Sequence, residues 1–164
     1  MGSSPPQQHP DLVPLAPLIG TWSGAGSGEY PTIRPFDYLE EVTFGHVGKP
    51  FLAYAQRTRA ADDGRPLHAE TGYLRVTAAD RVEWILAHPT GITEILEGQL
   101  DADGDRLHME LRSTVIGRST TAKDVASMER SITLDGDTLD YTVRMAAVDL
   151  PLQHHLAAVL RRSA

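Results

Sequence analysis

The stretch from residue 20 to residue 33, G-T-W-S-G-A-G-S-G-E-Y-P-T-I, constrains the fold more than any other part of the chain. One indole and four glycines share the same parity in it: Gly20, Trp22, Gly24, Gly26 and Gly28. Alternate side chains of a β-strand point to one face, so this face carries an indole and little else. Glycine in a strand marks a sharp bend or the close approach of another group. Two interpretations follow: a strand that lines a ligand cavity in a barrel, or a tightly coiled first strand with no ligand.

The second half of the chain shows the period-two alternation that is typical of half-buried strands. Leu107, Met109 and Leu111 alternate with polar residues, and the same pattern recurs over residues 128–134 and 139–145. Turns rich in Gly and Asp separate these segments. We therefore predict an all-β fold, a single antiparallel up-and-down β-barrel of about ten strands. Such a barrel is similar to those of lipocalins and fatty-acid-binding proteins, and closure removes its sheet edges.

Earlier strands are expected at five further ranges: residues 36–47, 51–60, 67–77, 81–88 and 91–100. Short helical turns are expected near both termini, the first over Asp11 to Ile19, capped by Asp11 and limited by two prolines. The tail from Asp149 to Arg162 fits either a short amphipathic helix or a helical turn followed by a closing strand. The closing strand is favoured because a barrel needs its first and last strands to meet.

Length and composition restrict the function classes. The 164 residues suit one domain, which we predict over residues 11–164 after a disordered leader over residues 1–10. The formal net charge of −7 argues against nonspecific nucleic-acid binding, and no apolar run reaches membrane-spanning length. The chain has no cysteine, which excludes disulfides and thiolate sites and fits a cytoplasmic location.

The seven histidines are the main candidates for chemistry. We predict that most of them are surface or leader residues without a ligand: His9, His46, His68, His88 and His108. His154 and His155 differ because they lie in an apolar segment. Adjacent residues of an extended chain point to opposite sides, so at most one of the two faces a barrel interior. From the pattern alone, a buried hydrogen-bonded histidine beside an exposed one explains the pair equally well.

The motif Gly-x-Trp-x-Gly-x-Gly with the following Tyr-Pro-Thr-Ile closely resembles the opening of the nitrobindin family of small heme-binding β-barrels. Residues 48–68 and the sequence E-T-G-Y-L-R after them are also similar, and the resemblance extends over residues 20–162. It implies a heme b cofactor whose iron is held by His155, the histidine immediately before Leu156. His154, beside this ligand position, is the unusual feature.

The resemblance also implies an enzyme, a ferric heme protein that binds nitric oxide and isomerises peroxynitrite to nitrate, with His155 as the catalytic ligand. The predicted cofactor-binding residues are His155, Thr32, Lys123, Trp22, Gly20, Gly24 and Gly26. Thr32 is explained equally well as a turn residue that bonds the local backbone, and Lys123 is either a partner for a propionate or a solvated lysine. An apolar wall without a hydrogen-bond donor is expected opposite the ligand, drawn from Trp22, Val42, Phe44, Leu86 and Met145. The expected protein is a monomer or homodimer with no nucleic-acid or membrane partner.

Two other functions remain as alternatives. A lipocalin-like or fatty-acid-binding-like carrier of an apolar small molecule would use His154 and His155 as packing residues. An enzyme with acid/base carboxylates would use Glu40, Glu41 or Glu70. We expect these three carboxylates instead on solvated strand faces or paired with nearby arginines.

Overall fold

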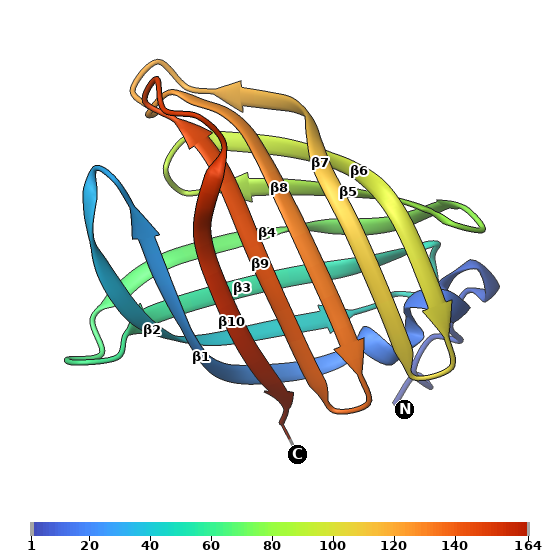
Figure 1. Ribbon diagram of the computed structural model, residues 1–164. Coiled ribbons are helices and arrows are strands. Elements are labelled where there is room, and N and C mark those ends of the chain that lie inside the picture. The colour runs from blue at the N-terminus through green and yellow to red at the C-terminus, as the bar shows by residue number, and fades with distance from the viewer. Residues whose placement is uncertain (1, 164) are drawn as a thin grey trace.

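The computed structural model describes residues 2–163, and over these residues the chain forms ten antiparallel strands closed into a barrel (Figure 1). The strands are β1 (Gly20–Tyr30), β2 (Ile33–Gly45), β3 (Phe51–Ala60), β4 (Pro66–Ala78), β5 (Arg81–His88), β6 (Ile92–Asp103), β7 (Arg106–Arg118), β8 (Val125–Asp135), β9 (Thr138–Ala147) and β10 (Gln153–Arg162). Each strand pairs with its neighbours in sequence, and β1 pairs with β10. The predicted up-and-down barrel of about ten strands is confirmed.

The last strand closes the barrel against the glycine-rich first strand. Trp22 lies opposite Arg162, and Gly28 lies opposite Leu156 in the antiparallel ladder. The predicted closing strand is therefore confirmed, and the alternative of an amphipathic C-terminal helix is wrong. The helical turn expected before this strand is also wrong, because residues 148–152 form a non-helical turn. Backbone pairing on both sides of β1 and β10 leaves neither strand as an open edge.

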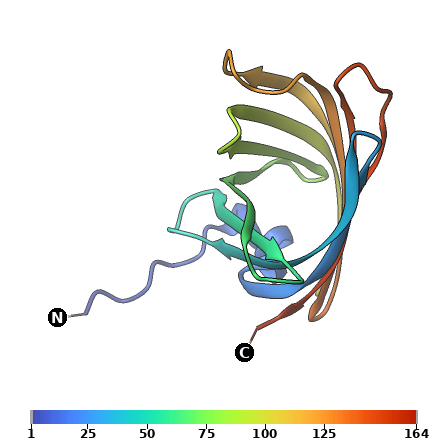
Figure 2. The same cartoon turned by 90° about the vertical axis from the view of Figure 1, so that its left-hand side faces the viewer.

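A short 3₁₀ helix, η1 (Pro10–Leu18), lies across one end of the barrel and contacts β3, β4, β6 and β7 (Figure 1). Its two internal prolines are compatible with a short 3₁₀ helix but would interrupt a longer α-helix. Three of its leucines are fully buried against the core: Leu12, Leu15 and Leu18. The cap differs from the prediction, because the imidazole of His9 accepts the backbone N–H of Asp11. Residues 2–9 precede the helix and extend away from the barrel (Figure 2). The disorder of this leader stays a prediction, and Met1 lies outside the described residues.

Trp22 lies at the end of the barrel that η1 covers, which we call the closed end. Its side chain is fully buried, and its indole N–H donates to the carbonyl of Leu18 at 2.8 Å. The guanidinium of Arg162 lies 4.3 Å from the centre of the indole ring and also donates to the carbonyls of Pro17 and Ile19. These bonds fasten the helix, the first strand and the last strand to one another.

The glycine-bearing face of β1 packs against the backbone of β10 and the ring of a tyrosine on β2. A methyl group at Gly24 would meet the backbone of Val159 on β10. A methyl group at Gly26 would meet the ring of Tyr38 on β2. At these two positions glycine therefore permits close approach of neighbouring strands and a tyrosine ring, as the tightly coiled interpretation of this strand expects.

The other end of the barrel is the mouth, which we define by the five connections at residues 31–32, 61–65, 89–91, 119–124 and 148–152. In an up-and-down barrel alternate connections lie at the same end, and these five lie opposite η1 (Figure 1). No helix within residues 2–163 is both long and apolar enough to cross a membrane.

Candidate functional site

His155 lies at an irregularity of β10 near the mouth. In the ladder with β9, His154 opposes Arg144 and Leu156 opposes Val143, so His155 is an extra residue at a register shift. Such a bulge bends a strand locally and redirects the side chain of the extra residue. The bulge separates the two histidines: His154 is exposed, whereas His155 is half-buried.

Hydrogen bonding fixes the tautomer of the His155 imidazole. Its Nδ1 lies 2.9 Å from the carbonyl oxygen of Glu29, which can only accept, so Nδ1 carries the proton. Nε2 therefore carries no proton, and its lone pair is available to a ligand-binding partner such as a metal ion. Burial lowers the pKa of His155, while the bond to the Glu29 carbonyl acts in the opposite direction. A neutral imidazole held through Nδ1 is the usual arrangement of a metal-ligating histidine.

Tyr30 supports the ring of His155. The two rings meet edge to face with their centres 5.5 Å apart. The Tyr30 hydroxyl accepts the backbone N–H of Ala147 at 2.9 Å and lies within hydrogen-bond distance of the carbonyls of Met145 and Ala147. The orientation of the imidazole is therefore set from two sides, by the Glu29 carbonyl and by an anchored aromatic ring.

An apolar cluster separate from the main core lies at the mouth. Its buried members are Tyr30, Val125 and Ala147, and its partly buried members are Ile92, Ile116, Met128, Met145 and Leu150. Partly exposed apolar side chains beside a free imidazole nitrogen provide the two things that heme needs, a ligand atom for iron and an apolar surface for the macrocycle. The residues at the mouth therefore fit a heme.

The remaining predicted cofactor residues fall into three groups, of which Gly24 and Gly26 pack against β10 and Tyr38 as described above. Thr32, in the turn between β1 and β2, and Lys123, between β7 and β8, are exposed at the mouth. Gly20 and Trp22 lie at the closed end, six or more residues along β1 from Gly28, which is roughly 20 Å in a strand. The structure therefore does not bring Gly20 and Trp22 to His155.

The expected apolar wall is distributed differently from the prediction. Within it, Trp22, Val42, Phe44 and Leu86 belong to the main core. Met145 packs in the cluster at the mouth. Two histidines also lie inside the mouth, so the interior there is not purely apolar, and the expected lack of a hydrogen-bond donor stays a prediction.

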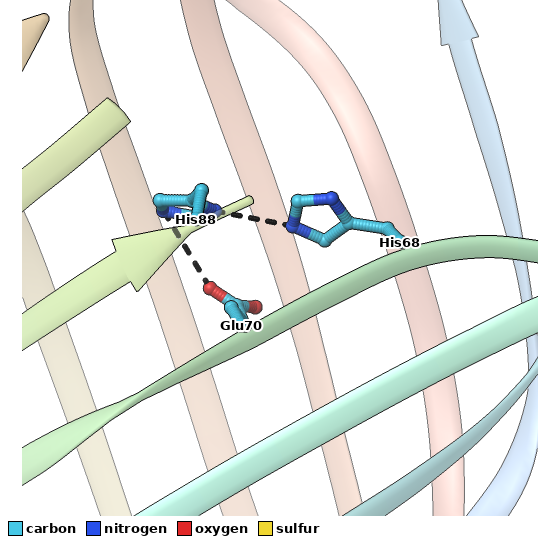
Figure 3. Close-up of side chains that lie close together, drawn as sticks. All are labelled: His68, Glu70 and His88. Carbon is cyan, nitrogen blue, oxygen red and sulfur yellow. Dashed lines mark hydrogen bonds and ion pairs between the residues drawn. The ribbon is translucent and has the colours of Figure 1, made fainter. Parts of the chain in front are cut away.

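His68 on β4 and His88 on β5, predicted as surface residues, point toward one another inside the barrel (Figure 3). His68 Nε2 lies 3.1 Å from His88 Nδ1, and His88 Nε2 lies 2.7 Å from a carboxylate oxygen of Glu94. The side chain of His88 is 9% exposed. The prediction failed for His88 because it ends its strand beside an expected turn, and for His68 because Glu70 and Gly72 on the same face of β4 made that face look solvated.

A layer of buried polar side chains crosses the interior below the two histidines. Arg130 on β8 donates to both oxygens of Glu70 on β4, at 3.2 and 3.0 Å, and to Glu94 on β6 at 2.6 Å. Glu40 on β2 accepts from Gln56 at 2.6 Å and from the hydroxyl of Tyr141 at 2.7 Å. Neither Glu40 nor Glu70 lies on a solvated face, because they are 4% and 7% exposed. The expected pairing with an arginine holds for Glu70, which binds Arg130, and is wrong for Glu40. Glu41 follows the expectation and pairs with Arg57 on the outer face.

The layer contains carboxyl groups in two electrostatic states. Burial raises the pKa of Glu40 to about 7, although hydrogen bonds from Gln56 and Tyr141 act in the opposite direction. Burial also acts to raise the pKa of Glu94, but the charge of Arg130 and the hydrogen bond of His88 outweigh it and lower this pKa to about 2. Glu94 is therefore an ionised carboxylate, and Glu40 is a carboxyl that titrates near neutrality.

Comparison with known proteins agrees with this geometry. Residues 11–162 match the family described as the THAP4-like, heme-binding beta-barrel domain. "Peroxynitrite isomerase 2" of Mycobacterium avium (strain 104) is 63% identical over 158 residues, covering 96% of this chain and 98% of the relative. "Peroxynitrite isomerase" of Nocardia farcinica (strain IFM 10152) is 64% identical over 154 residues, covering 94% and 92%.

The crystal structure of Rv2717c from M. tuberculosis has the same fold, with a TM-score of 0.94 and 56% sequence identity over 96% of this chain and 100% of that chain. The family match spans nearly the whole barrel, and the relatives are aligned from end to end. The chain therefore belongs to the family of THAP4-like heme-binding β-barrel domains, the nitrobindin family.

Proposed function

We propose that this barrel binds heme b at its mouth through Nε2 of His155, binds nitric oxide there, and isomerises peroxynitrite to nitrate. The observation that carries the proposal is the fixed imidazole of His155, with Nδ1–H donated to Glu29 and Nε2 free beside an apolar cluster. The relatives named peroxynitrite isomerase supply the reaction.

Each part of the mouth has a role in this proposal. A heme iron held by one histidine supplies an open coordination position and a redox centre. His155 holds the iron, and the Glu29 carbonyl and Tyr30 keep the imidazole in one orientation. Thr32 and Lys123 are proposed contacts at the edge of the heme, where the lysine ammonium neutralises a propionate.

The buried polar layer gives the carrier alternative less support. An acyl chain needs a continuous apolar cavity, whereas the ion pairs of Arg130 with Glu70 and Glu94 and the hydrogen bond from Gln56 to Glu40 cross the middle of this barrel. We further propose that the protein acts in the cytoplasm, as a monomer or homodimer, on small molecules rather than on nucleic acids or membranes. The absence of cysteine supports the cytoplasmic location, and the net charge of −7 argues against nucleic acid as a partner.

Hemin titration followed by absorption tests the proposal. His155→Ala removes the iron ligand and is expected to weaken hemin binding at least about 100-fold, since loss of a group that merely orients a ligand already costs 10- to 100-fold. His154→Ala is the matched control, because its exposed neighbouring imidazole points away from the site, and it should bind like the unmodified protein. An unchanged hemin spectrum in His155→Ala would refute the ligand assignment.

A further inference from the structure

The paired histidines lie on the wall of the mouth that faces His155. In the ring of ten strands, β5 is five strands from β10 in either direction. His88 is the last residue of β5, and His155 is near the start of β10, so both lie at the same end of the barrel. The wall that carries His68 and His88 therefore lies across the mouth from the strand that carries His155.

The hydrogen bonds of the pair dictate its tautomers. The Glu94 carboxylate receives Arg130 at 2.6 Å and can only accept, so His88 donates Nε2–H to it. Neutral His88 then carries a lone pair on Nδ1, which accepts Nε2–H from His68. The remaining nitrogen, His68 Nδ1, is a lone pair that points away from His88 (Figure 3) and makes no hydrogen bond to any residue of the described range 2–163.

We propose that His68 and His88 form a general base at the mouth, in which His68 Nδ1 takes the proton of peroxynitrous acid and the pair shares the resulting charge with Glu94. This inference rests on the proposed function, because it concerns the acid form of the same substrate. His68 is the catalytic residue, and His88 and Glu94 are positioning residues that act through it.

The proton balance is simple. The O–H bond of peroxynitrous acid breaks, an N–H bond forms at His68 Nδ1, and the peroxynitrite anion remains. The proton on His68 Nε2 moves to His88 Nδ1, and the bond from His88 Nε2–H to Glu94 strengthens. No atom is oxidised or reduced in this step. Nitrate leaves as an anion, so the extra proton returns to water at the mouth and the pair is restored.

The charges around the pair support one additional proton. Glu70 and Glu94 contribute two carboxylates against one guanidinium, that of Arg130. One buried oxygen of Glu94, Oε2, has no hydrogen-bond partner among the described residues and is a spare acceptor for a cationic neighbour. The other facing titratable groups are the hydroxyl of Tyr54 on β3, which donates to Glu70, and the carboxyl of Glu40 on β2. Burial lowers the pKa of His68, while the charge of Glu70 acts in the opposite direction.

A metal ion fits the same residues less well. His68, Glu70 and His88 lie close enough together to share a cation. However, His68 approaches Nδ1 of His88, whereas Glu70 lies 3.8 Å from the opposite nitrogen, Nε2. Both oxygens of Glu70 are already bound by Arg130. One ion therefore cannot replace all of these contacts without rearrangement, and the geometry favours a proton between the two imidazoles.

Nitrogen NMR of the full chain without heme tests the tautomers directly. We expect His68 and His88 to carry the proton on Nε2 and His155 to carry it on Nδ1. A proton on Nδ1 of His68 would overturn the proposal, because the outward nitrogen would then not be a base. Addition of equimolar Zn²⁺ is the second arm: unchanged signals of His68 and His88 support the proton pair, and their stoichiometric displacement overturns it in favour of a metal site.

The pH profile of peroxynitrite isomerisation by the heme-loaded protein tests the reaction. The loss of activity in His68→Leu is expected to be on the order of tenfold larger at about pH 6, where the acid form must be deprotonated, than at about pH 8. The control is His108→Leu, which removes a histidine from the outer wall of β7 and should leave the profile unchanged. A pH profile of His68→Leu that runs parallel to that of the unmodified protein would overturn the role of His68 as a general base.

The hemin spectrum separates two roles of His68, that of a general base and that of an iron ligand. We expect His68→Leu to keep the spectrum of the unmodified protein. A changed spectrum would mean that His68 binds the iron, and this would also overturn the general base. Failure of the unmodified chain to bind hemin through His155 would refute the proposed function, whereas the NMR tautomers would still decide whether the histidine pair is built as described.

Discussion

Glu40 and Glu41 are neighbours on β2 and have opposite surroundings. Glu40 points into the barrel, is 4% exposed, and accepts hydrogen bonds from Gln56 and Tyr141. Glu41 points outward and pairs with Arg57, directly opposite on β3, at 2.8 Å. One residue of register thus separates a carboxyl in the interior from one in solvent.

The two faces of the barrel make ion pairs of similar length with different consequences. Arg130 meets Glu70 and Glu94 at 3.0 and 2.6 Å inside, and Arg57 meets Glu41 at 2.8 Å outside. The Arg130 side chain is 8% exposed and the Arg57 side chain is 74% exposed. Distance therefore does not decide the energetic role of a pair. Burial decides it, because a buried charge that loses its partner has no water to replace it.

The largest expected effect is the removal of Arg130. Arg130→Met leaves the carboxylates of Glu70 and Glu94 buried without their cation, and we expect the free energy of unfolding to fall by about 3–5 kcal/mol. Urea unfolding followed by circular dichroism measures it. The loss should be smaller in acid, where the two carboxyl groups can protonate and become neutral.

Arg144→Met is the matched control, since Arg144 pairs with Glu129 at 3.2 Å on the half-exposed outer wall. Removal of this pair should change the unfolding free energy by less than about 1 kcal/mol. Equal losses in Arg130→Met and Arg144→Met would contradict the distinction between the inner and the outer pairs.

The sequence predicts the barrel well because its signals are local. Alternation with period two and turns rich in Gly and Asp place β3 and β5 at their observed bounds, 51–60 and 81–88. The closing of β10 on β1 follows from the need to leave no sheet edge. The cap of the helix was missed because an imidazole at His9 does what a carboxylate at Asp11 was expected to do.

The interior polar layer was predicted poorly because hydrophobic patterning treats charge as a sign of solvent. Arg130 shares its parity with Ile132 and Leu134, so the pattern did mark it as facing inward. Its partners Glu70 and Glu94 come from strands 60 and 36 residues away, and such pairing arises only when the barrel closes. His155 was chosen as the predicted ligand through family resemblance alone, because neither its bulge nor its bond to Glu29 has a signature in the local sequence.

The second effect is a pH dependence that originates from Glu40. Burial raises its pKa from 4.5 to about 7 in the folded protein, so the folded state holds a proton that the unfolded state has released. Glu40 therefore contributes full stability below about pH 4.5, and this contribution is lost as the pH rises to about 7, by at most roughly 3 kcal/mol.

Glu40→Gln should remove this dependence, because an amide of the same shape stays neutral. Unfolding free energies at about pH 5 and about pH 8 measure it: the unmodified protein should lose more stability between them than the variant. Glu41→Gln, the adjacent outward carboxyl, serves as the control and should leave the slope as it is. Equal slopes in all three proteins would show that Glu40 is ionised throughout.

The smallest effect is expected from Arg57→Met on the outer face. Arg57 and Glu41 form a short pair, but water solvates each of them once the partner is gone, so the unfolding free energy should fall by less than about 1 kcal/mol. Salt provides a further check, because screening weakens an exposed pair and should shrink the already small difference between the variant and the unmodified protein. A loss as large as that of Arg130→Met would mean that directly opposed charges stabilise the barrel through strand pairing itself, and burial would then not be the deciding variable.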